Sequence, residues 1–127
     1  MNTALIIVLS IIGLFALFQL FNYKKAKGME GREAPDTSTV DNGISDPKKV
    51  IFFHSPGCSP CKAIMPLVNE VQKEHSNLIV VDVSQNINLA RNFKLGGTPS
   101  FIAIEEGLIA QVKLGSVDQN WLTQYLT

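Results

Sequence analysis

The only two cysteines of the chain are separated by two residues in the motif CSPCK at 58–62. An apolar run at 50–53 precedes this motif, and a helical pattern at 62–75 follows it. If the run is a strand, Cys58 lies at the helix N-terminus, where unpaired amide N–H groups and the helix dipole favour a thiolate. Cys58 could then attack a disulfide, and Cys61, one helical turn further on, could resolve the mixed disulfide by closing a Cys58–Cys61 bond. The spacing therefore predicts thiol-disulfide exchange.

A structural disulfide or a metal site is the alternative explanation of the cysteine pair. A closed zinc site normally has four protein ligands, and the chain adds only His54 and His75 to the two cysteines. We therefore expect no resident metal and no cofactor. Delivery of copper(I) or zinc through Cys58, Cys61 and His54 stays open as a second function, because soft thiolates bind both ions. If His54 binds no metal, it is either a polar residue at a strand end or a modulator of the Cys58 thiol.

Composition excludes several classes of protein. The chain has 127 residues, enough for one domain, and its 11 basic residues balance its 11 acidic residues. No basic patch with interleaved aromatic residues occurs, so we expect no nucleic-acid partner. Two cysteines are also too few for the disulfide framework of a small secreted domain.

The first part of the chain is apolar. Ala4 to Phe21 contains no charged residue, and at about 1.5 Å per residue a helix continued to Tyr23 reaches roughly 30 Å, the thickness of a bilayer core. We predict a transmembrane anchor over 4–23. A cleaved signal peptide is disfavoured because no basic residue precedes the run and no small-residue cleavage site follows it. A buried helix is disfavoured because the segment is apolar on every face.

Residues 24–46 are predicted to be a flexible tether, because 28–46 is rich in Gly, Ser, Thr and Asp and shows no periodicity. An ordered strand near Thr39 is the alternative. Basic residues follow the apolar run, and the positive-inside rule then places the C-terminal domain on the cytoplasmic side of the membrane. The extracytoplasmic side stays open as the second possibility, because this rule rests here on one short flank.

From Pro47 to Thr127 the pattern alternates between strand and helix. Continuous apolar runs predict buried strands, an apolar stripe after the cysteines predicts an amphipathic helix, and Glu105-Glu106-Gly107 predicts a hairpin turn. Asp118 is suited to cap the last helix. The expected order is β-α-β-α-β-β-α, an α/β domain with a central mixed sheet and helices on both faces. Its elements are predicted at 50–53, 62–75, 78–83, 88–93, 100–104, 108–114 and 118 onward.

The stretch from Val50 to Leu126 resembles the thioredoxin superfamily. The resemblance covers about two thirds of the chain and rests on the following residues: CSPCK at 58–62, Pro66, VDVSQNINLA at 81–90, the turn Gly97-Thr98-Pro99, and Gly115. It implies a thioredoxin-like fold and a protein disulfide oxidoreductase, with Cys58 as nucleophile, Cys61 as resolving thiol, and Ser59 and Pro60 shaping the motif. A tethered binding module that only uses this fold is a further alternative.

The resemblance also implies a role for the turn at 97–99. Thr98-Pro99 is expected to be a cis peptide bond that lies against the cysteines, and Gly97, Thr98 and Pro99 are expected to bind substrate. The backbone of Thr98 would pair with an extended substrate chain, a sequence-tolerant mode of recognition. Protein disulfides or dithiols and an electron donor or acceptor are the implied partners. Alternatively, Pro99 only forms a turn and has no role in substrate binding.

The sequence departs from the superfamily's usual pattern at three places. Phe52 occupies the position of a buried Asp that helps deprotonate the resolving thiol, and Val80 occupies the position of a nearby Lys. The two losses are consistent, because either charge alone would be buried and unpaired. We therefore expect proton transfer at Cys61 to use water or substrate. The aromatic residues that usually come directly before the first cysteine are absent, and His54-Ser55-Pro56-Gly57 stands in their place. This change predicts a flatter surface for contact with substrates.

Overall fold

The computed structural model describes residues 2–41, 43–44 and 46–127. A long N-terminal helix precedes four strands and three further helices in the expected order β-α-β-α-β-β-α. Most of the predicted bounds agree with the structure to within two residues. The elements are α1 (Thr3–Lys27), β1 (Lys48–His54), α2 (Ser59–Glu74), β2 (Leu78–Asp82), α3 (Ile87–Asn92), β3 (Ser100–Glu105), β4 (Leu108–Leu114) and α4 (Gln119–Leu126).

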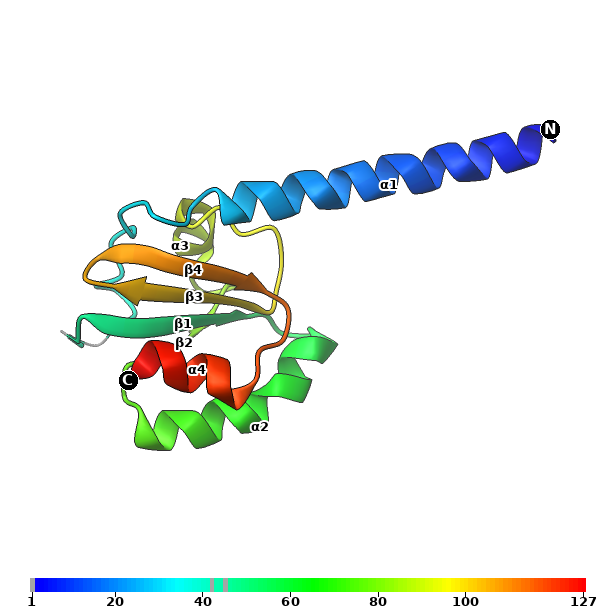
Figure 1. Cartoon of the computed structure of the whole chain (residues 1–127). Helices are drawn as coiled ribbons and strands as arrows, with labels where there is room; N and C mark the ends of the chain where they lie inside the picture. The colour runs from blue at the N-terminus through cyan, green and yellow to red at the C-terminus, as the bar shows by residue number, and fades with distance from the viewer. Residues whose placement is uncertain (1, 42, 45) are drawn as a thin grey trace.

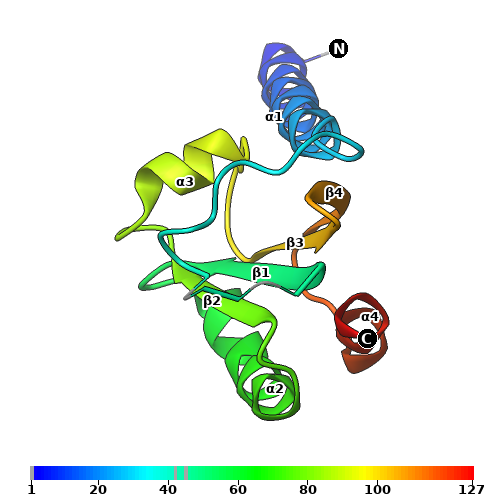
Figure 2. The same ribbon diagram turned by 90° about the vertical axis from the view of Figure 1, so that its left-hand side faces the viewer.

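The four strands form one mixed sheet in the order β2-β1-β3-β4. Strand β1 pairs in parallel with β2 and antiparallel with β3, and β3 pairs antiparallel with β4. Helices α2 and α4 cover one face of the sheet, and α3 lies on the other face (Figure 2). The predicted α/β architecture with helices on both faces is therefore confirmed.

Strand β1 forms the centre of the core. Its side chains alternate between two buried layers, because successive residues of a strand point to opposite faces. Ile51 and Phe53 belong to the layer that contains α3, whereas Val50 and Phe52 belong to the layer that contains α2 and α4. All four are fully buried. The short apolar run of the sequence is therefore a strand buried on both faces, as predicted.

Helix α2 begins earlier than predicted, at Ser59 instead of Lys62. Cys58 is the N-cap residue, and its sulfur accepts a hydrogen bond from the N–H of Cys61. Pro60 lies in the first turn, where its fixed φ fits the helix and its missing N–H leaves no helical bond unmade. The position of Cys58 at the helix N-terminus is therefore confirmed, and the helix begins three residues before Lys62, where the apolar stripe placed its first residue.

Helix α1 extends away from the domain (Figure 1). Its span Thr3–Lys24 is 22 residues long and apolar enough to cross a membrane, and none of that stretch is buried in the protein. The large side chains along it are exposed on every side, including Ile12 and Phe18. The apolar part of α1 is therefore left uncovered by the described residues of the chain, and only the C-terminal turns of the helix contact the domain, at Gly96 and β4.

The segment expected to be a tether lies against the domain at several points. Met29 is buried in the same layer as Ile51 and Phe53. The backbone of Gly31 and Arg32 exchanges hydrogen bonds with Ile109 at the outer edge of β4. Asn42 and Ser45, which belong to the predicted tether, are outside the described residues. The boundary at 46 stays a prediction, but the part of 28–46 that the structure describes includes ordered contacts.

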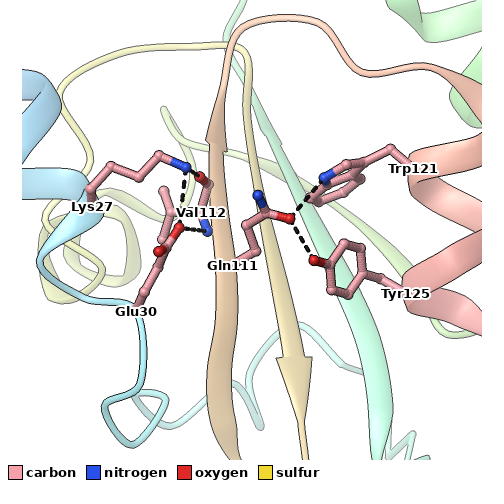
Figure 3. A network of polar contacts seen from close by, with 6 residues as sticks. All are labelled: Lys27, Glu30, Gln111, Val112, Trp121 and Tyr125. Carbon is pink, nitrogen blue, oxygen red and sulfur yellow. Dashed lines mark hydrogen bonds and ion pairs between the residues drawn. The ribbon is translucent and has the colours of Figure 1, made fainter.

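Polar side chains hold both sides of β4 (Figure 3). On one side, Val112 donates its N–H to Glu30 and accepts a hydrogen bond at its C=O from Lys27, which also pairs with Glu30 at 3.1 Å. Partial burial of Glu30 opposes its charge, but the bonds from Val112 and Lys27 outweigh this effect and lower its pKa.

On the other side of β4, Gln111 Oε1 accepts hydrogen bonds from Trp121 Nε1 at 3.0 Å and from the Tyr125 hydroxyl at 2.5 Å. Strand β4 thus connects α1 to α4.

The Gln111 contacts predict a stability effect. Gln111→Leu removes the acceptor shared by Trp121 and Tyr125, and we expect a loss of about 1–2 kcal/mol in the free energy of unfolding. Chemical denaturation in detergent micelles, followed by the fluorescence of Trp121, measures the change. The control Gln124→Leu, at an exposed position of α4, should change stability by less than about 0.5 kcal/mol. Equal denaturation midpoints for both variants would contradict the role of Gln111.

Candidate functional site

Cys58 and Cys61 are joined in a disulfide, with their Cα atoms 5.2 Å apart. The two sulfur-bearing residues differ in access: Cys61 is only 1% exposed, whereas Cys58 is half-buried. The N–H of Cys61 lies 3.2 Å from the Cys58 sulfur. A backbone N–H at a helix N-terminus stabilises negative charge on a sulfur, so Cys58 is both the more accessible and the better supported thiolate.

The loop before α2 is held by backbone contacts. Cys58 donates its N–H to the C=O of Ser55 at 3.3 Å. Gly57 adopts a φ of +78°, a left-handed conformation that side chains disfavour. The loop therefore turns sharply between the end of β1 and the cysteines, and it leaves Ser59 and Pro60 exposed beside Cys58.

The turn at 97–99 is adjacent to this loop. The bond Thr98-Pro99 is cis, as the resemblance implied. The Thr98 hydroxyl lies 2.8 Å from the Ser55 hydroxyl, which joins the turn to the cysteine loop. Gly97 accepts a hydrogen bond from the Ser100 hydroxyl at 2.6 Å, and Pro99 accepts one from the N–H of Gly115. The structure thus brings together two loops that lie far apart in the sequence.

Ser55 is a site residue that sequence reasoning missed. In the sequence it stands out only as one of the four residues that replace the usual aromatic residues before Cys58. Nothing in the sequence pairs it with Thr98, 43 residues away. The signal available was two short hydroxyl side chains, one just before the cysteine motif and one just before the cis proline.

His54 lies at the end of β1 with two identified neighbours. Its ring stacks on Phe52 at a centroid distance of 5.7 Å, and Asp82 is its partner across the β1–β2 pair. Hydrogen bonds from Ser84 lower the pKa of Asp82, with a smaller contribution from His54. These contacts fit the interpretation of His54 as a polar residue at a strand end, and its role as a modulator of Cys58 stays a prediction.

The two departures from the superfamily pattern meet in one apolar patch. Phe52 is fully buried and stacks on Phe101 at 4.6 Å. Val80 is its neighbour across the β1–β2 pair, and Cys61 belongs to the same buried layer. The positions that would carry a carboxylate and an ammonium are therefore adjacent, and here both are apolar.

Metal ligation was the alternative use of the cysteines. Within the part of the chain that the structure describes, no three His, Cys, Asp or Glu side chains come together as a possible metal site. In the disulfide state both sulfurs are also bonded to each other.

Two of the clefts formed by the described residues lie at opposite ends of the sheet. The larger one, of about 760 Å³, is lined by residues such as Asp46, Glu105 and Thr127, and it includes neither the cysteine loop nor the turn at 97–99. The smaller one, of about 400 Å³, is lined by Gly97, Thr98 and Pro99 together with the end of α1. The smaller cleft is therefore the one next to the candidate site.

Comparison with known proteins identifies the family. The family model described as Thioredoxin matches residues 35–127. The chain belongs to the thioredoxin family. Among curated relatives, thioredoxin of Mycoplasmoides gallisepticum is 28% identical over 90 residues, which is 68% of this chain and 90% of that protein. Thioredoxin of Buchnera aphidicola is 26% identical over 80 residues, 61% of this chain and 74% of that protein.

Solved thioredoxin structures agree with this membership. The reduced Schistosoma mansoni thioredoxin pre-protein superposes with a TM-score of 0.59 at 25% identity, over 66% of this chain and 84% of that one. The oxidised Plasmodium falciparum thioredoxin gives a TM-score of 0.60 at 23% identity, over 72% and 94%, which supports the fold. With its Cys58–Cys61 pair, this thioredoxin family member is a thiol-disulfide oxidoreductase, and thioredoxins act on protein disulfides.

The apolar patch around Cys61 predicts the effect of a restored carboxylate. Phe52→Asp places a buried acid in the layer of Cys61, and we expect the pH dependence of thiol alkylation to change because the acid titrates beside the thiol. Stopped-flow alkylation of the reduced protein from pH 5 to 10 measures the profile. Phe52→Leu is the matched control, since it also removes the aromatic ring but adds no charge. A profile for Phe52→Asp that coincides with that of Phe52→Leu would contradict the prediction.

Proposed function

We propose that this chain is a membrane-anchored thiol-disulfide oxidoreductase that exchanges disulfides with protein substrates, with Cys58 as the nucleophile and Cys61 as the resolving thiol. The observation that supports these roles is the difference in access between the two bonded cysteines. Cys58 is half-buried at the helix N-terminus, whereas Cys61 is enclosed in the apolar layer below it.

Exchange by this pair proceeds in two displacements. In the reduced protein, the Cys58 thiolate attacks a substrate disulfide, and one substrate sulfur leaves as a thiolate that takes up a proton. Cys61 then loses its proton and attacks the Cys58 sulfur of the mixed disulfide, which releases the second substrate sulfur. The substrate gains two electrons, and the protein is left with the Cys58–Cys61 disulfide. A dithiol partner returns the protein to the reduced state by the same steps in reverse.

Gly97, Thr98 and Pro99 bind the substrate chain in this proposal. The bond between the Thr98 and Ser55 hydroxyls supports it, because it fixes the turn beside the loop that carries Cys58. A substrate strand that pairs with the backbone of Thr98 then brings its own sulfur to Cys58. Ser59 and Pro60 are exposed at the start of α2 and shape the surface that such a strand meets.

Proton transfer at Cys61 uses water or a substrate group. Phe52 and Val80 offer no titratable side chain on the β1–β2 side of the layer that contains Cys61. The proton of the resolving thiol is therefore removed when the substrate is bound and the thiolate that leaves is near.

In this proposal, helix α1 anchors the protein in the membrane through residues 4–23. Its support is a span that is long and apolar enough to cross a membrane and that stays exposed along its length. Lys24, Lys25 and Lys27 follow the apolar run, which by the positive-inside rule favours a domain on the cytoplasmic side. The partners are then the lipid bilayer, protein disulfides or dithiols, and an electron donor or acceptor.

Trapping of mixed disulfides tests the roles of the two cysteines. Cys61→Ser cannot resolve the intermediate, so the full chain expressed in its own cells should form covalent complexes that dithiothreitol releases. Cys58→Ser should form none and should show no insulin reduction above that of dithiothreitol alone. Complexes with Cys58→Ser in place of Cys61→Ser would reverse the assignment.

Membrane extraction tests the anchor. The wild-type chain should stay in the membrane pellet after alkaline carbonate treatment, and its intact mass should include residues 4–23. Replacing both Ile11 and Phe15 by Lys costs about 3 kcal/mol per charge near the centre of the span, and this variant should become extractable. The control Gln85→Lys changes an exposed position of the domain and should stay in the pellet. A mature mass that lacks residues 4–23 would show a cleaved signal sequence instead.

A further inference from the structure

A short series of contacts connects the end of α1 to the reactive cysteine. A Cβ atom placed on Gly96 would lie 3.5 Å from the Cβ of Asn22, so the helix end lies directly against the loop before the cis proline. Two residues further on, the Thr98 hydroxyl lies 2.8 Å from that of Ser55. Ser55 in turn accepts a hydrogen bond from the N–H of Cys58. The proposed anchor is therefore connected to the loop of the proposed nucleophile through the segment at 96–98.

The smaller cleft lies between these parts of the chain. One wall is the turn at 97–99, where the proposed function places the substrate chain, and the opposite wall is the last turns of α1. None of the lining side chains carries a charge. They are Gln19, Asn22, Tyr23, Gly96, Gly97, Thr98, Pro99, Ser100, Leu114 and Gly115, around a volume of about 400 Å³.

The α1 wall is an addition to the family fold. The thioredoxin family model begins at residue 35, whereas Gln19, Asn22 and Tyr23 belong to the N-terminal helix. The helix end is held in place by Lys27, which bonds to Val112 on β4 and to Glu30 in the turn after the helix (Figure 3). This chain thus has a second wall beside its substrate turn that the common domain does not supply.

The span also sets the depth of this cleft in the membrane. Asn22 lies two residues before Lys24, the end of the apolar span, which is about 3 Å along the helix axis. Side chains at that depth lie in the headgroup region, where Tyr is enriched. Helix α1 also leaves the domain toward the end of the sheet where β1 ends and α2 begins (Figure 1). With α1 in the membrane as proposed, the cleft therefore lies at the membrane surface, and the cysteine loop is at the same end of the sheet.

We infer that this cleft docks an extended segment of a second integral membrane protein, with the reacting cysteine within a few residues of that protein's own transmembrane helix. The inference rests on the proposed function and adds a substrate class to it. An occupant must reach the headgroup region, continue along the turn at 97–99 and suit an uncharged wall. A juxtamembrane segment meets all three conditions, because it lies at the right depth and is covalently held there.

Reconstituted full-length protein in phosphatidylcholine vesicles tests the inference. The probes are one disulfide-containing peptide loop attached to a transmembrane helix through about four residues, the same loop attached through about 30 residues, and the free loop. The short attachment should react faster than the long one by about tenfold or more, because it holds the loop at the depth of the cleft and at high effective concentration. The rate of thiol release measures exchange.

Two variants locate the effect in the cleft. Tyr23→Ala removes a lining side chain and should reduce the advantage of the short attachment severalfold. Phe21→Ala is the matched control: it removes an aromatic ring from the same helix at a position that is 67% exposed and does not line the cleft. It should leave the ratio between the short-attachment and long-attachment rates unchanged. A further variant combines Lys27→Ala, which removes the bond to Val112, with about ten Gly and Ser residues inserted between Gly28 and Met29. It frees the helix from the domain and should abolish the advantage.

The outcomes separate this inference from the proposed function. If no probe reacts with the wild-type protein, the proposed function is wrong and the inference falls with it. If all three loops react at equal rates, exchange stands and the inference is overturned. The inference would also be overturned if Tyr23→Ala and Phe21→Ala lowered the rate advantage of the short attachment equally, because membrane confinement alone would then explain the rates. A lipid in the cleft would overturn the inference as well. Photoactivatable phosphatidylcholine would then label Tyr23, and the short-attachment probe would not displace it.

Discussion

The burial of β1 on both faces is the constraint on which the rest of the domain depends. A strand with apolar residues on both sides has to be covered twice, so α3 packs on one face and α2 with α4 pack on the other. Its two edges are also occupied, by β2 and β3. The strand is therefore fixed in all directions, and the loop that follows it places Cys58 at the start of α2 with little freedom.

Apolar periodicity predicted most of the fold, because burial decides where strands and amphipathic helices form. Strand β4 was predicted with the bounds that the structure has, and the capping role of Asp118 is confirmed by its bond to the N–H of Trp121. The segment at 28–46 was harder, since its contacts use backbone groups and a few scattered side chains such as Met29, Thr37 and Val40. Such contacts leave no periodic trace in a polar sequence. The earlier start of α2 was missed because it depends on the Cys58 cap and not on an apolar stripe.

The candidate site was predictable where chemistry fixes the residue type. Two thiols at helical spacing indicate exchange, and resemblance supplied the cis bond before Pro99, which the structure contains. The bond between Ser55 and Thr98 and the cleft beside Tyr23 were not predictable, because each joins segments that only the folded chain brings together. The replacement of a charged pair by Phe52 and Val80 was visible in the sequence, and the structure adds that the two positions are direct partners across β1 and β2.

The cover along the outer edge of β4 has a consequence under the proposed anchoring of α1 in a bilayer. An uncovered strand edge is a template for pairing with other chains, and confinement to two dimensions raises the frequency with which identical molecules meet. Here Lys27 and Glu30 occupy the polar groups of Val112, and the backbone of Gly31 and Arg32 occupies those of Ile109. The segment that joins helix to domain thereby protects the β4 edge of the sheet against pairing with other molecules at high surface density.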